Sequence, residues 1–61
     1  KPENIIEKGT TVCLFDFDNF KAGDIVNFMI YEVMGVKMVK LNGVIVIPYA
    51  DFLWNFEYLE I

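Results

Sequence analysis

Short runs of β-branched and aromatic residues, separated by turn-forming residues, make up the hydrophobic pattern of this chain. Residues 10–18 are the first run, and from Val12 onward apolar and charged positions partly alternate, so we expect a strand there. Residues 1–9 are expected to form a short helical turn or a flexible lead, because Pro2 suits the first position of a helix and Gly9 suits its end.

Residues 25–34 form a second apolar run, whose pattern fits two structures. As a helix, the run has Asp24 as its cap and places Asn27 and Tyr31 on one face. As a strand, its Val, Ile, Phe and Tyr content suits a β-sheet, with Asn27 and Glu32 on opposite faces. We favour the strand.

The dipeptide Asn42-Gly43 lies between two β-rich runs and predicts a two-residue β-hairpin, because both central residues of such a turn need positive φ. This turn would place Lys37 and Lys40 on opposite faces of the hairpin. The expected cross-strand pairs are Leu41–Val44, Lys40–Ile45, Val39–Val46, Met38–Ile47 and Lys37–Pro48.

The last part of the chain is expected to hold a short helical turn. Pro48 cannot donate to a β-ladder and should end the strand, and Phe52 and Phe56 lie one helical turn apart within residues 49–56. Residues 57–61 then alternate as a short strand or continue the helix.

The order of these segments resembles that of Src-homology-type (SH3-like) small barrels. Residues 13–26 look like the opening strand and diverging turn of that family, and the Asn-Gly hairpin, the Pro48-Tyr49 pair and a helical turn before a final strand follow in the same order. The resemblance implies a mainly β domain: a small barrel or curved antiparallel sheet of four to five strands with a short helical turn near the C-terminus. We expect residues 1–9 to be a lead and residues 10–61 to be the single domain. The tandem tryptophans of the family's peptide groove are replaced by Met38 and Val39, so the resemblance does not extend to proline-rich peptides.

The composition predicts that part of the apolar surface remains exposed to solvent. Of the 61 residues, 56% are hydrophobic and 16% aromatic, whereas a chain of this size buries only about 60% of the surface that its unfolded form exposes. The outward apolar groups are either scattered or gathered into a contiguous patch, and a patch would mark an interface with a partner or a second copy.

The charge balance and the single cysteine limit the kinds of partner and the cellular compartment that we expect. Five lysines, no arginine and nine carboxylates give a formal charge of −4, which disfavours nucleic acid and suits solubility or a basic partner. The runs are too short for a membrane span and no signal peptide is visible, so we expect a cytoplasmic protein with no membrane contact. The single Cys13 lies in an apolar run and is expected to be a buried, inert thiol.

No catalytic residue, metal site or cofactor is expected, and we interpret the protein as a non-enzyme. The chain has no His or Ser, one Cys and no Gly-rich phosphate loop. The alternative rests on Asp16 and Asp18, which would project from one side of a strand end and could hold a cation. That motif resembles the nucleophile strand of haloacid-dehalogenase-like phosphatases, although Phe20 replaces their small hydroxyl residue, and the first strand of NYN ribonucleases, with Asp16 and Asn19 at the metal-site positions. It therefore suggests a fragment of a metal-dependent nuclease or phosphatase.

Aromatic residues outside the expected core are the candidate contacts with a partner: Trp54, Tyr58, Tyr31 and Phe20. Our leading hypothesis is a small protein–protein interaction or assembly module, of the kind that phages encode to engage a host protein, which binds another protein or itself. A third hypothesis, a nucleic-acid-binding small barrel that uses Lys37 or Lys40, is the least consistent with the charge.

Overall fold

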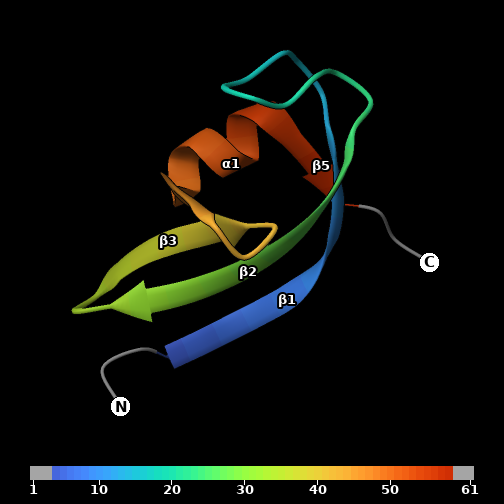
Figure 1. Ribbon diagram of the computed structural model, residues 1–61. Coiled ribbons are helices and arrows are strands. Elements are labelled where there is room, and N and C mark those ends of the chain that lie inside the picture. Colours follow the sequence, from blue (N-terminus) through green and yellow to red (C-terminus); the bar gives the residue numbers. More distant parts are fainter. Residues whose placement is uncertain (1–3, 59–61) are drawn as a thin grey trace.

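The computed structural model describes residues 4–58, with the side chain of Tyr58 outside the description. An antiparallel sheet of five strands curls into a half-barrel, and one short helix lies in its concave side (Figure 1). The elements are β1 (Asn4–Cys13), β2 (Ile25–Val33), β3 (Val36–Leu41), β4 (Ile45–Pro48), α1 (Tyr49–Asn55) and β5 (Phe56–Tyr58). The mainly β fold with a helical turn near the C-terminus is confirmed.

The strands follow the order β4-β3-β2-β1-β5. β2 is therefore the central strand, and β1 pairs with both β2 and the last strand, β5. Along β2 the side chains alternate as a pleated strand requires: Val26, Phe28 and Ile30 are buried on the concave, inner face. Val39 and Leu41 of β3 are completely buried beside them. The inner face of the sheet therefore forms one wall of the core.

A chain of aromatic rings fills the space between this wall and α1. The Phe52 ring lies 5.1 Å from that of Phe28 and stacks at 5.5 Å on Phe56, and Phe17 and Phe20 each meet Phe56 edge-on at about 6 Å. Phe52 is the one buried residue of α1, and together with the partly buried Tyr49 it packs the helix against the core.

The expected helical or flexible lead at residues 1–9 is wrong for its described part. Residues 4–9 belong to β1 and pair with β2, with a register shift between Ile5 and Glu7. Gly9 is a packing residue rather than a helix end: a Cβ there would lie 3.1 Å from the ring of Phe28.

The strand expected over residues 10–18 ends earlier, at Cys13. The Cys13 amide donates to the Asp24 carbonyl, the Gly23 amide donates to the Cys13 carbonyl, and the chain then leaves the sheet. Residues 14–24 form a long loop at the upper edge of the half-barrel in Figure 1. The apolar character of Phe15 and Phe17 therefore does not reflect a strand.

Of the other strand predictions, some are confirmed and one is wrong. Residues 25–33 form a strand, as favoured, and Asn42 and Gly43 have the expected positive φ, 52° and 77°, but the connection between the strands has three residues rather than two. The expected pairing is wrong by one residue, because Val44 is an extra residue in the connection and Leu41 faces Ile45. The observed pairs are Leu41–Ile45, Lys40–Val46, Val39–Ile47 and Met38–Pro48.

Candidate protein-binding surface

Trp54 is the most exposed aromatic residue of α1, with 77% of its surface accessible. Phe52 packs one side of α1 against the core. Its neighbours on the helix, Ala50, Asp51 and Leu53, are exposed, as Trp54 is. The helix begins directly after Pro48, whose φ of −64° and extended ψ are suited to entering a helix. The exposure expected for Trp54 is confirmed.

Two further apolar residues lie beside the end of α1. The amide of Leu14 donates to the carbonyl of Asn55 over 2.7 Å, which places the start of the 14–24 loop against the helix terminus. Leu14 is 40% exposed and Phe15 is 59% exposed. We define the α1 patch as Leu53 and Trp54 of the helix together with Leu14 and Phe15, whose backbone adjoins the end of α1.

One carboxylate lies beside Trp54 on α1. Asp51 is exposed and precedes Trp54 by three residues, so the two side chains are neighbours on the helix surface. Asp16 and Asp18 follow Phe15 in the loop and are also exposed. Asp51 therefore gives Trp54 an acidic neighbour, whereas the loop that holds Phe15 carries both carboxylates and the exposed Lys21.

The loop that carries Phe15 is held by hydrogen bonds of its own. Asp16 accepts from the Ala22 amide over 3.0 Å, and Asp24 accepts from the Lys21 amide over 2.9 Å. Phe17 and Phe20 exchange two backbone hydrogen bonds across a tight turn, in which Asp18 has φ of 56°. The loop thus presents Phe15 from a defined backbone.

Three of the aromatic residues predicted to bind a partner lie elsewhere. Phe20 is 8% exposed and packs on Phe56, so its ring belongs to the core rather than to the surface as expected. Tyr31 is 7% exposed and lies on the convex side of the sheet, between Ile5 and Met38. Tyr58 pairs through its backbone with Thr11, and its side chain lies outside the described residues.

The strand-end geometry proposed for Asp16 and Asp18 is wrong, because both residues lie in the loop, three or more positions after β1 ends. Asp16 already accepts a hydrogen bond from a backbone amide. Within residues 4–58 there is no group of three or more His, Cys, Asp or Glu residues placed to hold a metal ion.

Cys13, the residue before Leu14, belongs to the core. The side chain is 1% exposed and its thiol donates to the Phe15 carbonyl over 2.8 Å. Burial raises the pKa of the Cys13 thiol, and the carboxylates of Asp24 and Asp16 add to the rise. The expected burial of this thiol is confirmed.

No family model, curated protein or solved structure matches this chain. Among residues 4–58, no helix has the length and apolar character needed to cross a membrane.

Sequence reasoning found Trp54 but missed Phe15, Leu14 and Leu53. Phe15 was interpreted as part of a strand, since nothing in its local alternation shows that the strand ends at Cys13. The clue was the turn chemistry of Asp18 and Asn19, which places a reversal soon after Phe15.

Proposed function

We propose that the protein is a small protein–protein interaction module whose α1 patch binds a partner protein. The observation that carries the proposal is the 77% exposure of Trp54 on a helix whose inner side is firmly packed. A tryptophan left in water loses the free energy that its burial would provide, and such residues are the commonest anchors of interfaces.

The surroundings of Trp54 support an interface rather than an isolated exposed ring. Leu53, Phe15 and Leu14 are exposed apolar residues on α1 or next to its end, and Asp51 is a charged neighbour of Trp54 at the rim. An apolar centre with a polar rim is the usual anatomy of a protein-binding surface. The charge of the rim favours a partner with a basic margin, and a host protein engaged by a phage-encoded module remains our hypothesis for its identity.

The order of elements is compatible with the resemblance to Src-homology-type barrels at the level of a small barrel. The sheet order β4-β3-β2-β1-β5 and the helix between β4 and β5 support it, whereas residues 14–18, which the resemblance takes as part of the opening strand, lie in the loop after β1. We infer a related small-barrel architecture that uses a different surface, because the groove tryptophans of that family are Met38 and Val39 here.

The experiment is an affinity capture from a lysate of the source organism, with the wild-type chain and Trp54→Ala as paired baits. We expect at least one protein to be enriched on the wild-type bait and depleted on the variant. Val44→Ala is the control, because Val44 is also 77% exposed but lies in the β3–β4 connection outside the α1 patch, and it should leave the capture unchanged. Identical capture profiles for wild type and Trp54→Ala, with both baits folded, would contradict the proposal.

A further inference from the structure

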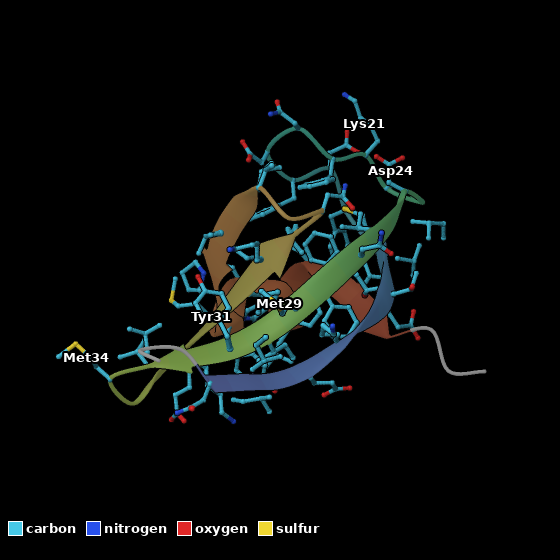
Figure 2. The ribbon with its side chains drawn as sticks, turned by 60° about the horizontal axis from the view of Figure 1, so that its bottom comes forward. Lys21, Asp24, Met29, Tyr31 and Met34 are labelled. Carbon is cyan, nitrogen blue, oxygen red and sulfur yellow. The ribbon has the colours of Figure 1, made fainter. Side chains whose placement is uncertain are left out.

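The edge of β1 that faces away from β2 is open along most of its length. β1 has ten residues, but β5 pairs with only the last three, Thr11, Val12 and Cys13. No other described strand lies beside residues 4–10 on that side, and Figure 2 shows β1 at the border of the sheet, next to β2. These residues are exposed, except for the half-buried Thr10. An uncovered strand edge of this kind is a template for pairing with another strand.

A hydrogen bond just after β1 fixes which of its main-chain groups face the open edge. The Leu14 amide donates to the carbonyl of Asn55, the residue before β5, so it points to the β5 side of the strand. Successive residues of a strand direct their N–H and C=O groups to alternate sides, and the register with β2 is regular over residues 7–12. Lys8 and Thr10 therefore direct their main-chain groups to the same side, where an added strand would engage them.

The side chains along this edge define the residue types that suit an added strand. Gly9 has no side chain, and a Cβ there would lie 3.1 Å from the ring of Phe28. An aromatic side chain directly opposite an edge glycine fills the gap that the glycine leaves. Lys8 is exposed on the other face of the sheet, where a carboxylate opposite it would form a cross-strand ion pair. In an antiparallel strand, the edge therefore suits an aromatic residue followed by an acidic one.

A second copy of this chain fits the edge less well. Two identical antiparallel strands related by a two-fold axis place one residue opposite its own copy. Registers centred on residues 7 and 8 oppose Glu7 to Glu7 or Lys8 to Lys8, and like charges directly opposite each other are destabilising. A register centred on Gly9 pairs only residues 8–10 before it reaches Thr11, which already pairs with β5.

We propose that the open edge of β1 binds an extended segment of another protein, which adds to the sheet antiparallel to β1 and in line with β5. β5 supports this, because it occupies the adjoining three positions of the same edge in the same direction. The added strand exchanges main-chain hydrogen bonds with Lys8 and Thr10 and places its aromatic and acidic residues opposite Gly9 and Lys8. This site is separate from the α1 patch and is a second surface of contact.

The test uses a capped pentapeptide, Thr-Phe-Glu-Thr-Val, as the probe, with its Phe designed to lie opposite Gly9 and its Glu opposite Lys8. Nuclear magnetic resonance of the chain follows binding, and the amides of Lys8 and Thr10 should become protected from hydrogen exchange when the probe is added. Methylation of the Glu amide nitrogen, which faces β1, should weaken binding by about tenfold or more. Methylation of the Phe amide nitrogen, which faces away, should weaken it by less than about twofold.

Charge reversals on the chain provide matched controls. Lys8→Glu should weaken binding by about threefold or more, and a probe with Lys in place of Glu should recover it. Lys21→Glu makes the same change of charge in the 14–24 loop, far from β1 in Figure 2, and should leave binding unchanged. Trp54→Ala should bind the probe as the wild type does, because the α1 patch is not involved.

Unchanged amide signals over residues 4–10 at about 2 mM probe would overturn the inference, and so would equal losses from the two methylations. A wild-type dimer that the probe dissociates would assign the edge to a second copy instead. Probe binding that appears only after removal of residues 59–61 would assign it to the chain's own C-terminal residues. In each case, capture of a protein that depends on Trp54 would leave the proposed function standing.

Discussion

At the scale of single residues, α1 separates stability from binding within one turn. Phe52 is 1% exposed and contacts two rings, whereas Trp54, two positions later, is 77% exposed. We expect Phe52→Ala to lower the free energy of unfolding by about 3 kcal/mol or more, because it leaves a cavity in the core. Trp54→Ala should change it by less than about 0.5 kcal/mol. Urea denaturation followed by circular dichroism measures both, and a loss above about 1 kcal/mol for Trp54→Ala would mean that its ring is part of the core.

Substitution of Gly43 should lower stability through backbone strain alone. Its φ is 77°, and no atom lies within 4 Å of a Cβ placed there. Gly43→Val should lower the free energy of unfolding by about 1 to 3 kcal/mol, because a β-branched residue is strained at positive φ. Gly43→Asn should lose clearly less, since Asn tolerates this conformation. Equal losses in the two variants, measured by thermal and urea unfolding, would exclude backbone strain as the cause.

The buried thiol of Cys13 makes the free energy of unfolding depend on pH. Because burial raises the pKa of its thiol, the unfolded chain ionises at a lower pH than the folded chain. The free energy of unfolding therefore falls as pH rises above the ordinary thiol value of 9.0. We expect the stability advantage of the wild type over Cys13→Ala to shrink from about pH 8 to pH 10.5. A constant difference across urea titrations in that range would show that the folded-state pKa is not raised.

At the scale of elements, the 14–24 loop depends on its carboxylates as hydrogen-bond acceptors. Asp16→Ala removes the acceptor of the Ala22 amide and should cost about 1 kcal/mol, whereas Asp16→Asn retains an acceptor oxygen and should cost less than half of that. Urea denaturation checks the order of the variants. The same samples, titrated calorimetrically with Mg²⁺ and Mn²⁺, should show no submillimolar binding; binding that Asp16→Asn abolishes would favour the nuclease or phosphatase alternative.

The sequence predicts those elements whose causes are local. The Asn42-Gly43 turn is specified by two adjacent residues, and the Ile25–Val33 strand by its own composition. The register of the hairpin depends on one extra residue, Val44, and on core packing that buries Ile47 opposite Val39. A one-residue shift turns every side chain to the other face, and the turn sequence alone does not decide between the two.

Other boundaries were missed because their causes lie far away in the chain. Gly9 pairs with Phe28 of β2 and leaves room for its ring, and neither contact can be inferred from the residues around Gly9. The side chain and amide of Asn42 bind the backbone of Asn27 over 3.1 and 2.8 Å, so the tip of the hairpin is also fixed by a contact outside it. In the candidate site, helical spacing predicts only the exposure of Trp54. The exposure of Phe15 depends on where β1 ends.

At the scale of the whole molecule, a small core buries only part of the apolar residues. The aromatic chain from Phe28 to Phe20 fills the interior, and large apolar residues remain outside, among them Trp54 in the α1 patch and Met34 and Val44 in the turns. This agrees with the limited capacity of a 61-residue chain to bury its apolar surface. We infer that the surfaces left outside are where the protein acts.

The most direct measurement is the dissociation constant of the captured partner, or of a second copy, for the wild type and for Trp54→Ala, by calorimetric titration of folded samples. The loss of an aromatic anchor should cost about 2 kcal/mol, so the account predicts a dissociation constant about 30-fold larger for the variant at unchanged thermal stability. Equal dissociation constants for the two proteins would contradict it.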